Sequence, residues 1–393
     1  MRAMQNVRKL YALRFFSGLI PAYVIERLFW EARGMTVPMV VSTEILYAAA
    51  VALTEVPLGV AADKWGRKRM LVLSAVIGCC EFLFLVFATE YWHFALVVAL
   101  TAIGRSASSG AEDALLYDSL SAAGRANEFE AHVGRLNALD IAAVMLAALS
   151  GSLLAERFGF EWNYWLSFGS MTVAAVLALS LSEPDAVGRA EDGEPDIPLR
   201  TYVTASLRLF RRDRGLLLAV LSGTVVGAAV NFVDEFWQIY LDRLGVPVAF
   251  FGLASATLFL LRLPGNLLAD RLRRRFRYRT LFASATAAFA VCFAALAAAP
   301  KLAGFAALAL VGLFAGAVEP LATGYLHRRA DSAMRATMGS FQSLIENAAL
   351  VAVGIGFGYA SSSTDIFGGF GFLAAVCGAW FVAFFAASRG VVE

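Results

Sequence analysis

The sequence has little charge, little cysteine and little histidine. Charged residues make up 16% of its 393 residues and hydrophobic residues 59%, with four cysteines and three histidines. It contains no Walker phosphate-binding loop, no catalytic triad and no His/Cys cluster with metal-ligand spacing. These absences leave ATP-driven pumping and membrane enzymology without support. We therefore expect neither an enzyme nor a bound cofactor or metal, and no nucleic-acid partner.

The few cysteines and histidines lack the spacing of a site. Every cysteine falls inside an apolar run with no oxidising loop to share, so we interpret these residues as buried thiols: Cys79, Cys80, Cys292 and Cys377. The histidines are scattered near predicted helix ends, and we expect none of them to be a ligand: His93, His132 and His327.

Long apolar runs are abundant. Mean hydropathy is +0.67, which is far from that of a soluble domain. A run of about 20 apolar residues can cross a bilayer as a helix. We count twelve such candidates, at residues 10–31, 38–61, 70–89, 93–119, 134–156, 163–182, 215–240, 248–269, 280–299, 303–327, 337–360 and 366–388.

The loops between these segments alternate in charge. Cations gather on one side of the predicted membrane, at Arg2, Arg8, Lys9, Lys64–Arg69, Arg125, Arg208–Arg214, Arg271–Arg279 and Arg328–Arg335. The opposite loops hold few: Arg33, Arg157, Arg243 and Lys301. Because loops rich in lysine and arginine stay in the cytoplasm, both termini are predicted to be cytoplasmic.

The loop after the second segment reads Gly59-Val-Ala-Ala-Asp63-Lys64-Trp-Gly66-Arg67-Lys68. Gly59 offers no side chain to hold a neighbouring helix away, and Asp63 can accept hydrogen bonds from a helix start or pair with cations. An ordinary basic loop obeying the positive-inside rule would also carry such cations. The pattern G-x-x-x-D-[RK]-x-G-[RK]-[RK] at this position resembles the signature loop of the major facilitator superfamily of secondary transporters.

That resemblance implies an all-α membrane protein with twelve transmembrane helices in two pseudo-symmetric six-helix halves. It implies transport by alternating access, in which the halves rock around a midplane site. The signature-loop residues are then expected to act as a conformational switch, with Asp118 bracing the Arg67 region: Gly59, Asp63, Gly66, Arg67 and Asp118.

The two halves of the sequence correspond at an offset of 207 residues. The shift maps Phe29-Trp30 onto Phe236-Trp237, Pro57 onto Pro264, Asp63 onto Asp270, Glu112 onto Glu319 and Gly151 onto Gly358. An internal repeat of this kind predicts two related bundles. We therefore expect a half at residues 1–182, a cytoplasmic linker at 183–213 and a second half at 214–393.

The predicted linker begins with acidic Pro-containing stretches and ends with apolar residues near helical spacing among arginines. The apolar set is Leu199, Tyr202, Val203, Leu207 and Phe210. An amphipathic helix on the inner membrane surface would explain this pattern. An extension of the seventh spanning helix would explain it as well.

Charges inside the predicted spans indicate a wet cavity, since each costs about 2.5–3.5 kcal/mol at a helix centre. In the fourth segment, Arg105 and Glu112 are seven residues apart, which places them on one face of a continuous helix. This segment resembles the fourth-helix motif of proton-coupled drug exporters, although Gly110 falls five residues after the arginine rather than four. The proton-coupling candidates are Glu112, Glu319, Asp113 and Arg105. A purely structural Arg105–Glu112 pair is the alternative.

In the resembled fold, helices 1, 4, 7 and 10 line a central cavity. The substrate-binding candidates are therefore Glu26, Asp234, Glu235, Trp30, Trp237, Asp140 and Glu346. Placement at the outer headgroup level is the alternative for Glu26 and Asp234, and interfacial anchoring is the alternative for the tryptophans. Asp140 and Glu346 correspond loosely under the repeat and are expected to bridge the halves in one conformation.

The sequence thus predicts a monomeric, proton-coupled secondary transporter of the bacterial inner membrane, most like drug and metabolite exporters. Its expected partners are a small-molecule substrate, cationic or amphiphilic in character, protons and the lipid bilayer. The fifth segment lacks the glycine-proline signature of the resembled antiporters, since Met145–Ser152 contains no proline. Uptake of a small metabolite and a non-transporting ligand sensor therefore stay open as alternatives.

Overall fold

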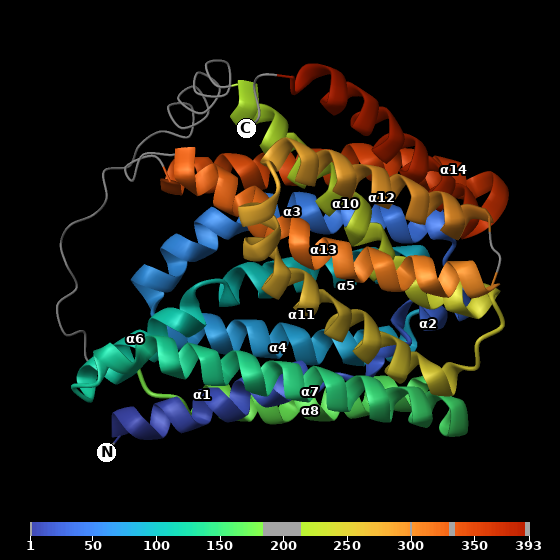
Figure 1. The fold of residues 1–393 in the computed structure, drawn as a ribbon. Helices are drawn as coiled ribbons and strands as arrows, with labels where there is room; N and C mark the ends of the chain where they lie inside the picture. Colours follow the sequence, from blue (N-terminus) through green and yellow to red (C-terminus); the bar gives the residue numbers. More distant parts are fainter. Residues whose placement is uncertain (1, 184–213, 299–300, 330–334, 390–393) are drawn as a thin grey trace. The chain divides into compact units, whose positions relative to one another are not determined.

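The computed structural model describes residues 2–183, 214–298, 301–329 and 335–389, and all regular structure within them is helical (Figure 1). The chain divides into two compact units. Unit 1 comprises Met1–Asp192 and Gly245–Ala256, and unit 2 comprises Gly193–Leu244 and Thr257–Glu393. The predicted amphipathic helix and most of the predicted linker lie outside the described residues.

Unit 1 contains the helices α1 to α8 with two short 3-10 helices. Their bounds are α1 Arg2–Gly18, η1 Pro21–Val24, α2 Glu26–Ala32, α3 Val37–Trp65, α4 Arg67–Phe87, α5 Tyr91–Ser108, α6 Ala111–Ala122, η2 Ala126–Glu128, α7 Phe129–Phe158 and α8 Phe160–Ser180. The 3-10 helix η3, Val248–Phe250, also belongs to this unit. Helix α1 packs on α6, α7 and α8, while α4 packs on α5 and α8.

Two of the predicted spans in unit 1 are broken helices. The first is interrupted between α1 and α2, where Pro21 at the start of η1 has no N–H to continue the helical ladder. The fourth breaks between α5 and α6, where Gly110 adopts φ +70°, a left-handed conformation that glycine takes without a Cβ penalty. The break replaces the single long helix that the spacing of Arg105 and Glu112 assumed.

Aromatic side chains fill the core of unit 1 where η1 and α2 meet α4, α5 and α8. The ring centroids of Phe29 and Tyr164 lie 4.1 Å apart, and those of Trp30 and Phe94 lie 5.0 Å apart. All four side chains are buried. Each ring removes a large apolar area from solvent or lipid contact, so this cluster stabilises the broken first span.

Unit 2 consists of five helices: α10 Arg214–Arg243, α11 Phe251–Arg275, α12 Tyr278–Ala298, α13 Lys301–Arg329 and α14 Arg335–Ala387, of which α11 begins within residues assigned to unit 1. Helix α14 departs from helical geometry at Thr364 and Asp365, so it carries both of the last two predicted spans. Stacked Phe232, Phe236 and Phe357 tie α10 to α14, with centroids of Phe232 and Phe357 at 4.7 Å.

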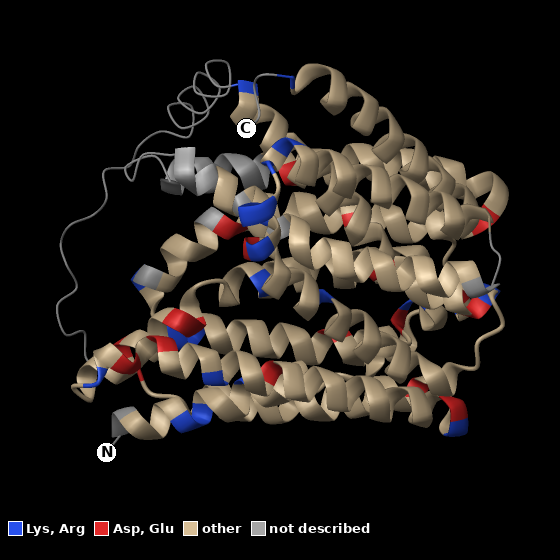
Figure 2. Cartoon of the chain, viewed as in Figure 1, with Lys and Arg blue, Asp and Glu red and all other residues tan. Residues whose placement is uncertain are grey.

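The described helices suit a bilayer. Nine of them are long and apolar enough to cross a membrane by length and composition, counted among the described residues alone. Figure 2 shows charged residues gathered towards helix ends, with few along the apolar middles. The all-helical membrane architecture predicted from the sequence is confirmed. All twelve predicted spans fall largely on helix, although those at 10–31 and 163–182 lie outside the nine.

Candidate functional site

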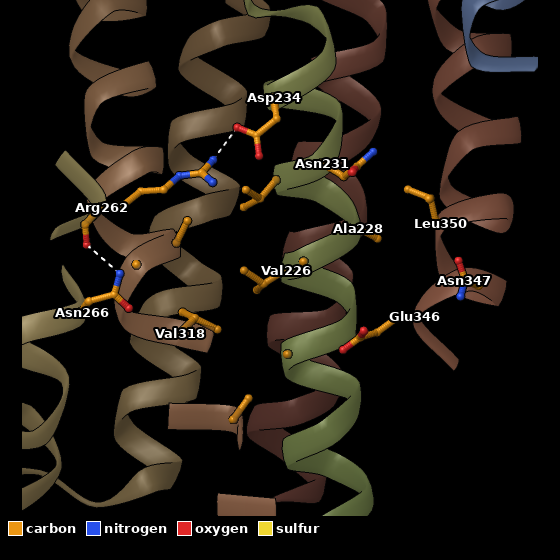
Figure 3. Close-up of a pocket in the computed structure, with 16 residues that line it drawn as sticks. Val226, Ala228, Asn231, Asp234, Arg262, Asn266, Val318, Glu346, Asn347 and Leu350 are labelled. Carbon is orange, nitrogen blue, oxygen red and sulfur yellow. Dashed lines mark hydrogen bonds and ion pairs between the residues drawn. The ribbon is translucent and has the colours of Figure 1, made fainter. Parts of the chain in front are cut away.

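A cavity of about 570 Å³ opens within unit 2 between α10, α11, α13 and α14. Small residues of α13, among them Ala315 and Gly316, form part of its wall. Its polar lining comes from the other three helices, as Figure 3 shows: Asn231 and Asp234 on α10, Arg262 and Asn266 on α11, and Glu346 and Asn347 on α14.

Helical spacing explains how α10 and α11 each present a pair of polar groups to this cavity. Asn231 and Asp234 are three residues apart, and Arg262 and Asn266 are four apart, so each pair shares one helix face. Arg262 forms a hydrogen-bonded ion pair with Asp234, while the Asn266 side chain donates to the Arg262 carbonyl at 3.2 Å (Figure 3). The pocket therefore offers a neutralised ion pair, three carboxamides and one further carboxylate.

Glycines bring α11 and α13 into backbone contact beside the cavity. A Cβ at Gly316 would collide with the Arg262 carbonyl, and one at Gly265 would collide with the carbonyl of Leu313. Small residues at such crossings let membrane helices approach closely. This contact holds the Arg262 backbone in place, so the guanidinium extends from a fixed point towards Asp234.

The signature loop is a tight helix–helix turn in unit 1. Gly66, at φ +102°, ends α3 and begins α4. Arg67 forms an ion pair with Asp118 of α6 and donates to the Ala114 carbonyl at 3.0 Å. The Glu183 carboxylate, which no sequence motif indicated, accepts hydrogen bonds from the backbone N–H groups of Arg67 and Lys68, both at 2.9 Å.

The expectations about the glycine and the acids of this loop have different outcomes. Helix α3 does not end at Gly59 but continues to Trp65, so the expected helix end at Gly59 is wrong. The close approach of another helix to Gly59 stays a prediction. The side chain of Asp63 falls outside those that the structure describes, and so does the side chain of Glu319. The switch role expected of Asp63 and the proton-coupling role expected of Glu319 therefore stay predictions.

The expectation that Arg105 and Glu112 share one face of a continuous helix is wrong, and the structure does not show the alternative of a structural pair between them. Arg105 lies exposed in the last turn of α5, while Glu112 begins α6 beyond the break at Gly110. Glu112 instead pairs with Arg14 of α1, with Arg14 Nη1 3.2 Å from Glu112 Oε2. Spacing within one segment could not reveal a partner on another helix. The neighbouring Asp113 is exposed.

The other acidic candidates of the two units are placed as follows. Asp140 of α7 lies against α1, since a Cβ at Gly18 would come within 3.0 Å of Asp140 Oδ1. Glu346 lines the cavity of unit 2. Glu235 follows Asp234 on α10 and is partly buried, but it does not belong to the cavity lining. The bridge expected between Asp140 and Glu346 stays a prediction.

The first-span candidates form a buried polar cluster in unit 1. Arg27 is 5% exposed and donates from Nη2 to Glu44 Oε1 at 2.7 Å, with Glu26 Oε1 3.9 Å from its Nη1. Its guanidinium also lies over the Trp30 ring at 4.5 Å. Trp30 and its repeat mate Trp237 are both buried, so the interfacial-anchor interpretation of these tryptophans is wrong.

A comparison with protein families decides the identity of the fold. The family model described as Major Facilitator Superfamily matches residues 10–354. The chain belongs to this superfamily. It is therefore a multi-pass membrane protein and a secondary transporter, and the resemblance seen in the signature loop is confirmed.

Solved structures of facilitator proteins share the fold across the whole chain. A mutant form of the nucleoside transporter NupG superposes with a TM-score of 0.81 at 14% identity, covering 97% of this chain and 99% of that one. A D-xylose–proton symporter gives a TM-score of 0.70 at 13% identity, covering 100% and 98%. At such identities the likeness shows the fold alone.

One curated relative matches part of the chain. An uncharacterized transporter from Buchnera aphidicola subsp. Schizaphis graminum (strain Sg) is 25% identical over 122 residues. The match covers 31% of this chain and 30% of that relative, so the chain matches less than a third of the relative's length.

Proposed function

We propose that this facilitator protein is a proton-driven secondary transporter whose C-terminal half recognises a small hydrophilic solute in the cavity of unit 2. The polar lining of that cavity is the observation that carries the proposal. The lining contains three charged side chains, Asp234, Arg262 and Glu346, and also three carboxamide side chains. Specificity for hydrogen-bonding solutes arises where a pocket holds a few placed polar groups.

This chemistry favours a solute with several hydroxyl, amide or amine groups over the amphiphilic drug suggested by the sequence. Carboxamides both donate and accept, so they suit a ligand with mixed polar groups. A lipophilic ligand would displace water from these side chains without offering them hydrogen bonds in exchange, which lowers affinity. A cationic amine is also compatible with the site because Glu346 adds negative charge.

Proton coupling and direction belong to the same proposal. Export is the direction to which the resemblance of the fourth segment to drug exporters points. Uptake is the second candidate, because a protein with this fold is named as a D-xylose–proton symporter. We place the protein in the inner membrane of a bacterium with both termini in the cytoplasm, following the cation distribution.

The test uses the purified full chain in proteoliposomes, with radiolabelled uridine and D-xylose as hydrophilic probes and ethidium as a lipophilic cation. A pH gradient of either sign is imposed, and each gradient is then collapsed with a protonophore. We expect a hydrophilic probe to move under one sign of gradient and to stop moving with the protonophore; that sign gives the direction. Movement of ethidium alone would contradict the polar-solute proposal. Binding of a probe without movement under either gradient would instead indicate a ligand sensor.

A further inference from the structure

Asp365 lies in the turn of α14 that joins the last two predicted spans, and its backbone adopts φ +56° and ψ −157°. Residues other than glycine rarely take this conformation, because their Cβ crowds the neighbouring backbone. Every other positive φ in the described part of the chain belongs to a glycine. Asp365 is therefore strained, and such strain persists only where surrounding contacts hold it.

The corresponding turn of unit 1 contains a glycine. Between α7 and α8, Gly159 has φ +90° and ψ 166°, which is close to the conformation of Asp365. The 207-residue offset maps Gly159 onto Ile366, the neighbour of Asp365. The acid of the unit 1 turn is Glu161, which lies in the first turn of α8 and pairs with Arg33 at 2.7 Å. Unit 1 thus separates the turn residue from the paired acid, whereas unit 2 combines both in Asp365.

An ion pair ties the strained turn to the end of α10. Arg243, the last residue of α10, donates from Nε to Asp365 Oδ2 at 2.6 Å and from Nη1 to Asp242 Oδ2 at 3.1 Å. A partly exposed ion pair by itself contributes little to stability. This one also restrains the backbone, because a change of φ at Asp365 would turn its short side chain away from Arg243.

The two helices that this ion pair joins both supply polar groups to the cavity of unit 2. Helix α10 carries Asp234 and α14 carries Glu346 (Figure 3). Further along the same helices, Phe236 of α10 stacks on Phe357 of α14, with ring centroids 5.3 Å apart. Helix α14 keeps helical geometry from Glu346 up to the turn, so a shift at the turn can pass along it to the cavity.

We propose that Asp365 is a positioning residue for the cavity of unit 2. Its ion pair with Arg243 holds the strained turn of α14, and the turn sets the position of Glu346 relative to Asp234. The consequence for solute recognition rests on the proposed function, whereas the restraint on α14 does not.

The first measurement is hydrogen–deuterium exchange of the full chain in lipid nanodiscs. Asp365→Asn and Arg243→Gln each remove the ion pair, so both should speed exchange in the α14 peptides around Glu346. The double variant should show no further change, because both substitutions remove the same contact. The matched control is Glu161→Gln, which removes the ion pair of the unit 1 turn and should leave exchange in α14 at the parental rate.

Asp365→Gly tests the strain separately. Glycine adopts a positive φ at no steric cost, so this variant should unfold at a higher temperature than Asp365→Asn, although both lack the ion pair. In an unstrained turn glycine would lower stability, because it has more freedom in the unfolded chain. A lower unfolding temperature for Asp365→Gly than for Asp365→Asn would therefore overturn the strained turn.

The second measurement is equilibrium binding of radiolabelled uridine and D-xylose to the same proteins. A shift of one cavity helix weakens binding without removing a contact to the solute. We expect the Kd of the probe that binds to rise by about two- to thirtyfold in Asp365→Asn and to stay unchanged in Glu161→Gln.

The combined results decide between the restraint and its use. Parental exchange in a folded Asp365→Asn protein would overturn the proposal, and Arg243→Gln decides in the same way if Asp365→Asn does not fold. Faster exchange with an unchanged Kd would overturn the role in recognition. Faster exchange in the variants of a protein that binds neither probe would uphold the restraint on α14 while counting against the proposed function.

Discussion

The two units correspond in sequence at an offset of 207 residues, but they use charged side chains in opposite ways. Unit 1 buries its ions in pairs, as in Arg27 with Glu44, whereas unit 2 turns its Asp234–Arg262 pair towards a cavity. Under the 207-residue offset, Arg27 corresponds to Asp234, and Arg262 corresponds to Glu55. The sign of the charge at each place is thus reversed between the repeats.

Two carboxamides of the unit 2 lining have apolar counterparts in unit 1, since the same offset relates Asn231 to Val24 and Asn266 to Gly59. The third, Asn347, corresponds to Asp140. The internal repeat therefore sets the arrangement of helices within each unit. A few residues that differ between the two copies decide whether the interior of a unit is packed or open to a solute. We expect changes in unit 1 to affect folding and changes in unit 2 to affect recognition.

The largest effect is expected from Arg27→Ala. The substitution removes the cation to which Glu44 is hydrogen-bonded, and breaking a buried ion pair from one side costs about 3–5 kcal/mol. Thermal unfolding of the purified protein should show a strong loss of stability, and Arg27→Met combined with Glu44→Gln should recover much of it. An unchanged unfolding temperature in Arg27→Ala would mean that unit 1 does not depend on its buried pairs.

Asp234→Asn is expected to impair transport rather than folding. It removes the anion that neutralises Arg262 inside the cavity, so we expect a fall of about tenfold or more in transport of the best probe, equivalent to about 1.4 kcal/mol. Asp242→Asn is the matched control, because Asp242 lies at the end of the same helix and outside the cavity. If both variants lost the same share of transport activity, the cavity would not be the site that recognises the solute.

Arg14→Ala distinguishes the observed partner of Glu112 from Arg105, the partner in the alternative that the sequence left open. Arg14 is partly exposed, with 33% of its side chain accessible, so we expect a loss of about 1 kcal/mol. Arg105→Ala should change unfolding little because Arg105 is exposed. Stability measured for both variants should rank them in that order, and the reverse ranking would restore the Arg105–Glu112 pair.

The smallest effect is expected at the signature loop. Glu183→Gln weakens the cap on the first turn of α4, where a carboxylate also complements the helix dipole, and should cost about 0.5 kcal/mol. The same change at exposed Glu156 of α7 gives the control for loss of charge. Thermal unfolding and probe transport measured together would show whether the cap also affects switching; identical behaviour of both variants would leave Glu183 without a role.

Composition and local pattern were sufficient for the fold. Apolar runs of bilayer length, alternating loop charge and the motif around Gly66 are local features, and a membrane forces such runs into helices because backbone groups must pair internally. The break at Gly110 was less accessible to local reasoning, since glycine is tolerated within membrane helices as well as at their ends.

The sequence by itself determined that this chain is a helical membrane protein, because burial in lipid selects helices for long apolar runs, and its signature loop pointed to the facilitator superfamily. Only the tertiary structure decided which charges meet. Arg14 and Glu112, Arg27 and Glu44, and Asp234 and Arg262 lie on different helices, and Glu346 reaches the cavity from α14. Such pairings depend on helix rotation and packing, which a spacing measured along one helix does not contain.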